Sequence, residues 1–129
     1  MTSEQYAEHP KRVAELVEQK NFDEAVNILQ MLMESDLPPL DRSIMSVNMA
    51  VVCDLMGHVD HALAWYDHGI ALETPLMRCF VALHKASYLA GKGRNAEAAE
   101  IYERVVEEPF LTLSEVEGAQ ANLKAVRSA

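Results

Sequence analysis

Apolar residues recur along this chain at steps of three and four, which is the spacing of one face of an α-helix. The trio Val13, Leu16 and Val17 shows this spacing, and the segment 25–32 repeats it. No segment alternates apolar and polar residues over the length of a strand. The pattern therefore predicts an all-α chain with almost no strand.

Prolines and glycines divide this pattern into seven expected helices. Proline suits the first turn of a helix, so we expect Pro10 near the start of the first and Pro75 at the start of the fifth, with Thr74 as its N-cap. Ser114 and Glu117 have the spacing of a capping box for the last helix. The expected ranges are 10–19, 23–34, 41–56, 60–72, 75–90, 95–107 and 114–127. The short loops between them predict antiparallel neighbours.

A short motif recurs three times, at 20–25, 57–62 and 93–98, each time at the start of the second helix of a pair. It ends in Ala25, Ala62 and Ala98, which are 37 and 36 residues apart. A large residue follows each alanine four positions later: Leu29, Tyr66 and Tyr102. A fixed period of this length predicts a helical repeat array. We expect the alanines where two helices approach closely, with the large residue filling the space beside them.

The motifs Gly57-x4-Ala62-x3-Tyr66 and Gly93-x4-Ala98-x3-Tyr102, each followed by a proline, resemble the tetratricopeptide-repeat family. The resemblance implies one domain over residues 1–129, built as a right-handed α-solenoid of stacked antiparallel helix pairs. The implied repeats are about 6–39, 43–76 and 79–112, with a capping helix at 113–129. The chain departs from the family at Lys20, where glycine is usual, and at Leu29, where an aromatic residue is usual. The cap has one apolar stripe, made of Leu113, Val116, Ala119, Leu123 and Val126.

The segment 43–56 is apolar almost all round its helical wheel, and a helix of this kind must be covered on nearly every side. In the family that it resembles, the first helices of the repeats line a concave groove. That resemblance places Ile44, Val47, Val51 and Leu55 toward the groove, with Asn48 and Asp54 at its margins. In the next repeat, Phe80 and Leu83 would extend the surface, with His84 and Ser87 beside them.

Two interpretations of this groove remain open. The residues of a tightly curled solenoid can cover one another or pack on the N-terminal segment. Alternatively, they can form an apolar groove for an amphipathic or extended segment of a partner protein. Some members of the family bind a C-terminal carboxylate with Lys, Arg and Asn. Only Asn48 matches that set here, since Pro10, Ala14 and Phe80 stand at its other polar positions and His84 stands where a cation would be. We therefore expect no carboxylate clamp.

Charge and cysteine usage narrow the classes of partner. The formal net charge is −9, which opposes binding to nucleic acid because such binding depends on Lys and Arg. The acidity keeps the chain soluble or steers a basic partner toward it. The two cysteines, Cys53 and Cys79, lie in apolar sequence, as reduced buried thiols do, so we expect a cytoplasmic protein. No signal peptide and no membrane-spanning run is recognisable, so we expect no membrane insertion.

Polar side chains that could suggest an enzyme gather in one segment, 54–68. They are Asp54, His58, Asp60, His61, Asp67 and His68. Their spacing matches no known metal motif, and the chain has no P-loop, dinucleotide fingerprint or nucleophile elbow. We therefore expect a solvent-facing polar surface, no cofactor, no metal and no catalytic residue. The sequence predicts a protein-interaction module acting as a scaffold, adaptor or chaperone. The alternative is a structural protein that assembles with itself through the same groove.

Overall fold

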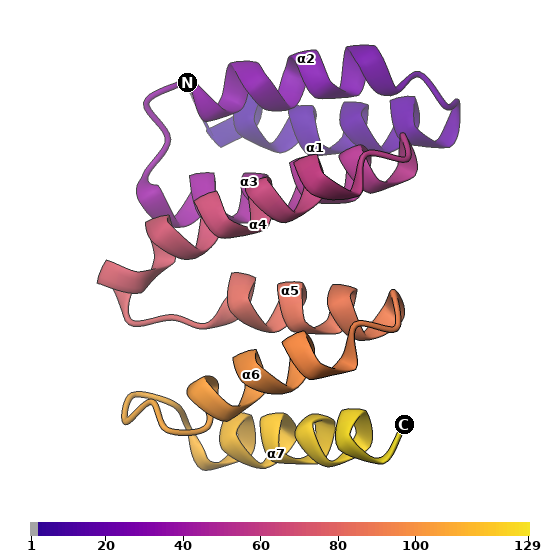
Figure 1. Cartoon of the computed structure of the whole chain (residues 1–129). Helices are drawn as coiled ribbons and strands as arrows, with labels where there is room; N and C mark the ends of the chain where they lie inside the picture. Colours follow the sequence, from indigo (N-terminus) through magenta and orange to yellow (C-terminus); the bar gives the residue numbers. More distant parts are fainter. Residues whose placement is uncertain (1–2) are drawn as a thin grey trace. The chain divides into compact units, whose positions relative to one another are not determined.

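The computed structural model describes the backbone of residues 3–129 and the side chains of residues 8–129, and this part of the chain is helical without any strand. The all-α class is thereby confirmed. The chain divides into two compact units, Met1–Leu72 and Glu73–Ala129, which are described separately. The elements in chain order are α1 (Ser3–Glu18), α2 (Phe22–Met33), α3 (Pro39–Leu55), α4 (Val59–Glu73), the short 3₁₀ helix η1 (Thr74–Leu76), α5 (Phe80–Gly91), α6 (Asn95–Val105) and α7 (Leu113–Ser128) (Figure 1).

The three predicted motifs form the same turn. The backbone at Lys20, Gly57 and Gly93 is left-handed, with φ of 59°, 82° and 76°. The amide of the next residue donates to the carbonyl five positions back, at 2.7, 2.9 and 2.9 Å respectively. This is the hydrogen bond of a Schellman motif, which satisfies a free carbonyl at the end of a helix. The sequence period is therefore a structural period as well.

The cores of both units form where these turns bring two helices together. Ala25, Ala62 and Ala98 have no exposed surface, and the large residues four positions later are also buried. In the first unit α1 packs on α2 and α2 on α3, and in the second α5 packs on α6 and α6 on α7. A side chain of one methyl group lets two helix backbones approach closely, which is why alanine recurs at this position.

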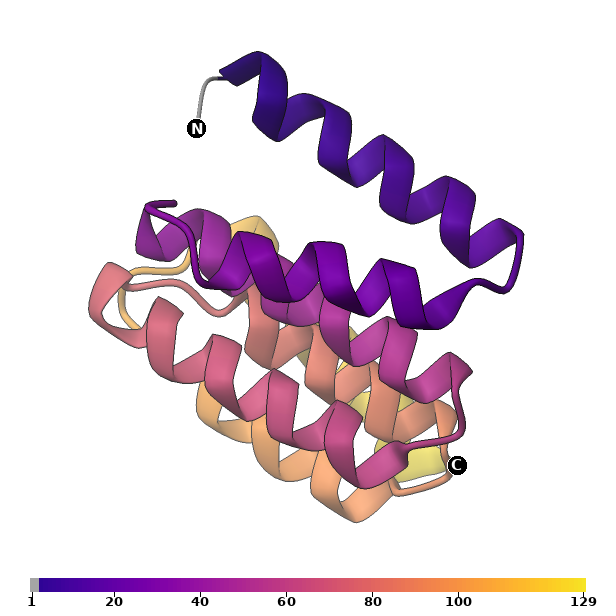
Figure 2. The same ribbon diagram turned by 90° about the horizontal axis from the view of Figure 1, so that it is seen from above.

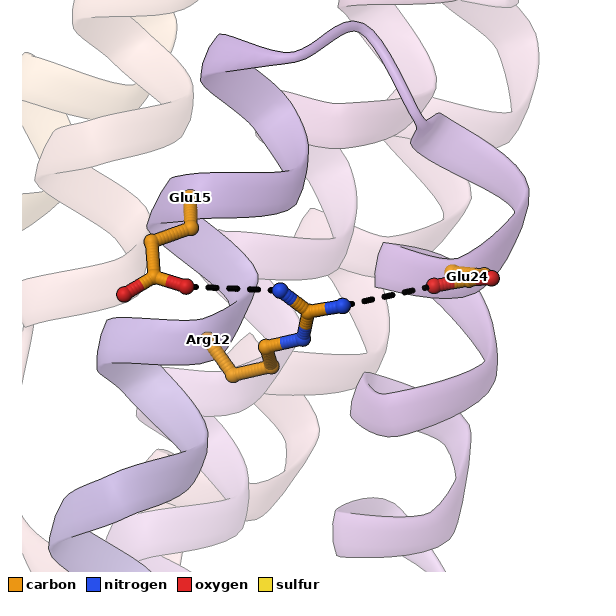
Figure 3. A network of polar contacts seen from close by, with 3 residues as sticks. All are labelled: Arg12, Glu15 and Glu24. Carbon is orange, nitrogen blue, oxygen red and sulfur yellow. Dashed lines mark hydrogen bonds and ion pairs between the residues drawn. The ribbon is translucent and has the colours of Figure 1, made fainter.

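An ion-pair network joins α1 to α2 at the surface of the first unit. The Arg12 guanidinium lies 3.3 Å from the Glu15 carboxylate on its own helix and 3.8 Å from the Glu24 carboxylate on α2 (Figure 3). The two helices run in opposite directions beside each other (Figure 2). Exposed pairs of this kind contribute up to about 1 kcal/mol each. The packed apolar residues therefore hold this helix pair, and Arg12 adds to them.

The prediction for the first helix was wrong at its start. The helix α1 begins at Ser3 and contains Pro10 in its interior. Proline has a helical φ but no N–H, so one hydrogen bond of the ladder is missing there. The prediction assumed that an interior proline breaks a helix, but α1 continues through Pro10.

The start of the fifth helix was also wrong, because Pro75 lies in η1 and Met77 then adopts a left-handed φ of 55°. The helix α5 begins only at Phe80, and its first turn is capped by the carboxylate of Glu73, several residues earlier in the chain. The Val81 amide donates to Oε1 of Glu73 at 2.8 Å, and the Ala82 amide donates to Oε2 at 3.0 Å. Glu73 is 1% exposed, so a buried carboxylate meets the positive end of the helix dipole. Burial raises the pKa of Glu73, while these hydrogen bonds act in the opposite direction.

The capping box of the last helix lies two residues earlier than predicted. Thr112 is the N-cap, and its hydroxyl accepts from the Glu115 amide at 3.2 Å. The Thr112 amide in turn donates to the Glu115 carboxylate at 3.1 Å. Ser114 and Glu117 fit the same pattern by type, but the helix had already begun at Leu113. Leu113 was expected in the buried stripe of this helix and is instead 74% exposed.

Candidate functional site

An apolar hollow of about 240 Å³ lies between α1 and α3 in the first unit, over Leu29 of α2. We call it the α1–α3 groove. Its wall on α1 is formed by Pro10, Val13, Ala14 and Val17. Its wall on α3 is formed by Met45, Asn48, Val51 and Val52.

The depth of the groove comes from the packing of three helices. Leu29, Met45 and Val52 are buried at its base, whereas Val51 is 44% exposed at its rim. Asn48 is half-buried and is the one side chain in the lining with an amide, whose nitrogen lies 3.9 Å from the Met45 sulfur. An apolar hollow with a single polar group suits an apolar side chain of a ligand and fixes its orientation through few hydrogen bonds.

The structure brings only some of the predicted groove residues together in this hollow. Asn48 and Val51 line it. Ile44 and Asp54 are half-buried on α3 outside the lining, Val47 is 6% exposed, and Leu55 is exposed at the end of the helix. The four predicted residues of α5 belong to the second unit.

In that unit, Phe80 and Leu83 line a different hollow, formed with the loops before α5 and α7. The His84 ring packs edge-on against Phe80, with 4.6 Å between ring centroids, and Ser87 is exposed. Phe80 and Leu83 are therefore neighbours, as the helical wheel predicts.

The α1 wall was largely missed by sequence reasoning. Pro10 and Ala14 were considered only as positions of an absent carboxylate clamp, and Val13 and Val17 only as part of a helical stripe. The signal was present: Pro10, Val13, Ala14 and Val17 follow the three- and four-residue steps of one helix face. What the sequence could not show is that this face turns toward α3 across α2.

The polar side chains of segment 54–68 do not converge. The rings of His58 and His61 lie 5.3 Å apart at the turn, and His68 packs against Trp65 instead. Among the described side chains, no group of three or more His, Cys, Asp or Glu is placed to hold a metal ion. Burial raises the pKa of the Cys53 thiol, which disfavours the thiolate that a nucleophile requires.

Two findings bear on the class of protein. None of the described helices is both long and apolar enough to cross a membrane. No family model, curated protein or solved structure matches the chain.

Proposed function

We propose that this protein is an interaction module, a scaffold, adaptor or chaperone, that holds an apolar segment of a partner protein in the α1–α3 groove. The observation that carries the proposal is the combination of a hollow with apolar walls and a half-exposed valine, Val51, at its rim. Amphipathic helices and extended segments insert apolar side chains into grooves of this kind. No catalytic group and no cofactor enters this proposal.

The internal repeat supports the same class of function. Three equivalent turns with left-handed residues at Lys20, Gly57 and Gly93 support our proposal of a repeated helix-turn-helix unit that resembles the tetratricopeptide repeat. Proteins built of such repeats commonly bind other proteins through extended surfaces. The α-solenoid architecture and a cytoplasmic location are parts of the same proposal.

The test separates loss of binding from loss of folding. Val51→Ser removes an apolar contact at the rim, and Ala14→Arg places a long charged side chain at an exposed position of the opposite wall. Ala96→Arg is the matched control, because Ala96 is also an exposed alanine, on α6. Proteins retained by the immobilised full chain from an extract of its source cells are identified by mass spectrometry.

We expect one set of proteins to be retained by the wild type and by Ala96→Arg and to be lost from both groove variants. The unfolding free energy of Val51→Ser should fall by less than about 1.5 kcal/mol, because nearly half of the side chain is already exposed. Equal retention by all four proteins would reject the groove as the binding surface. A loss of several kcal/mol in Val51→Ser would show that the residue supports the core instead.

The alternative function, self-assembly through the same groove, gives a different result. Sedimentation of the wild type would then show a mass that rises with concentration, and Ala14→Arg would restore the monomer. A monomer at all micromolar concentrations would exclude this alternative.

A further inference from the structure

We propose that a second hollow, within the unit Glu73–Ala129, binds a peptide segment in which a large apolar side chain is flanked by Lys or Arg. This hollow, which we call the loop hollow, has a volume of about 370 Å³. It lies where the loop before α5 meets the loop before α7, and Met77, Phe80, Phe110 and Glu115 are among the residues that line it. It shares no residue with the α1–α3 groove, so the inference goes beyond the function proposed for that groove.

The walls of the loop hollow hold apolar side chains that the fold leaves in solvent. Met77 is 66% exposed, and Phe80 and Phe110 are each 36% exposed. Leu76 and Leu113, beside the same two loops, are exposed as well. Large apolar side chains that gather around a hollow mark an interaction site more often than single ones scattered over a surface. The volume is at the low end of the range for ligand pockets, roughly 300–1,000 Å³, which suits one or two side chains of a peptide.

The segment that contains the loop before α7 is acidic. Between residues 106 and 118 the chain carries Glu107, Glu108, Glu115 and Glu117 and no basic residue. Burial raises the pKa of the Cys79 thiol, which lines the loop hollow, to about 11, and the charges of Glu73, Glu108 and Glu115 add to this rise. Of these three glutamates, Glu115 lines the hollow itself, and the charges of all three act on the Cys79 thiol in its wall.

Among the residues that line the loop hollow, Arg78 is the one cation. The Arg78 guanidinium lies 5.9 Å from the centre of the Phe80 ring, and its charge helps to lower the pKa of Glu115, after the hydrogen bonds from Thr112. At Cys79, in the wall of the hollow, the charges that act are those of three glutamates: Glu73, Glu108 and Glu115. The field that remains favours a ligand that brings positive charge beside its apolar anchor.

Charge also selects among the classes of ligand that could cover an apolar hollow. A second copy of this chain brings a net charge of −9, and nucleic acids and anionic lipid surfaces are negative too. Each of these would add like charges to an acidic rim, which is unfavourable at low salt. A peptide with basic and apolar side chains complements both the apolar walls and the acidic surroundings of the hollow.

The experiment uses the full chain and three short fluorescein-labelled peptides with the same Leu and Phe core, flanked by Lys, by Gln or by Glu. Affinity is measured by fluorescence anisotropy at low and high salt. We expect the Lys peptide to bind at least about tenfold more tightly than the Glu peptide, and the difference to shrink at high salt. The Lys peptide should also slow alkylation of Cys79, followed by mass spectrometry of the digested protein.

The variants locate the site. Phe110→Ser should weaken all three peptides, and Glu108→Gln should weaken the Lys peptide alone. Glu100→Gln, the same change at an exposed position of α6, is the matched control and should leave affinity unchanged. Both Gln variants change exposed side chains and should keep the helicity of the wild type by circular dichroism.

Four results would overturn the proposal. The first is equal binding of the Lys and Glu peptides. The second is an equal effect of Glu108→Gln and Glu100→Gln. The third is a failure of the bound peptide to protect Cys79. The fourth is a concentration-dependent dimer, seen by sedimentation, that Phe110→Ser abolishes, because a second copy would then be the ligand of the loop hollow.

Discussion

Each of the three equivalent turns has one residue with left-handed backbone, and Lys20 is the only one of these three residues that is not glycine. Its replacement tests the repeat directly. Its φ of 59° is left-handed, as are those of Gly57 and Gly93. A side chain with a Cβ atom is strained in this conformation, whereas glycine is not. We therefore predict that Lys20→Gly stabilises the first unit, and that Gly57→Ala and Gly93→Ala destabilise the units that contain them.

The magnitude follows from two opposing terms. The left-handed conformation costs an L-residue about 1–2 kcal/mol, and glycine loses about 0.5–1 kcal/mol more backbone entropy on folding. The difference is a gain of roughly 0.5–1 kcal/mol for Lys20→Gly. The two alanine variants should lose a similar amount. A Cβ atom at Gly57 or Gly93 meets nothing within 4 Å, so steric clash adds nothing to that loss.

The position of the only tryptophan makes the assay specific to one unit. Trp65 lies on α4 in the first unit, whereas circular dichroism reports helices of both units. Urea unfolding followed by tryptophan fluorescence should shift to higher urea for Lys20→Gly and to lower urea for Gly57→Ala. Gly93→Ala should change the transition seen by circular dichroism. The control is Lys20→Ala, which removes the charge and the long side chain but retains the strained Cβ.

Two outcomes would refute the reasoning. If Lys20→Ala stabilised as much as Lys20→Gly, the gain would come from the lost side chain and not from the backbone. If Lys20→Gly lowered stability, the left-handed turn of the first motif would be incorrect, and the equivalence of the three motifs would fail with it.

Three further predictions concern Glu73, Cys79 and Ala62. Glu73→Ala should lower the unfolding free energy by about 2 kcal/mol and Glu73→Gln by about half of that, because alanine leaves two helix amides without a partner and glutamine leaves one; urea titration measures both, and equal losses would contradict this account. The Cys79 thiol has a pKa of about 11, so at pH 8 it should react with iodoacetamide roughly a hundredfold more slowly than a thiol of pKa 9. Its rate should rise about tenfold for each unit of pH up to about 11. A rate that levels off near pH 9 would show an ordinary thiol. Ala62→Leu should cost about 1–3 kcal/mol by overpacking the core around this fully buried side chain, and an unchanged melting temperature would place Ala62 outside a packed interface.

The class of fold was predictable from sequence because it depends on local patterns. Apolar steps of three and four give helices, and the spacing of Ala25, Ala62 and Ala98 gives the repeat. The helix starts were less predictable, because several residues compete to begin a helix. Thr112 and Ser114 both offer a capping hydroxyl with a glutamate three residues later, and in the structure Thr112 is the N-cap.

The cap of α5 shows what sequence patterns cannot provide. Glu73 lies eight residues before Val81, beyond the reach of any capping motif. It reaches the amide because η1 and the left-handed Met77 turn the chain back on itself. The α1–α3 groove was partly predictable for a similar reason: the wheel of α3 indicates Val51, but the opposite wall depends on how α1 packs.

The residues that define the repeat and the residues offered to partners are different sets, and this difference makes fold and function separable by mutation. The alanines and the large residues of the motif are buried in every copy, so they carry stability. Val51, Phe80 and Phe110 lie outside the motif, and each is at least one-third exposed. An exposed apolar side chain contributes little to folding, because it remains in contact with water, yet its burial by a partner stabilises a complex. Substitutions at Ala62 should therefore impair both folding and binding, whereas substitutions at Val51 and Phe110 should impair binding alone.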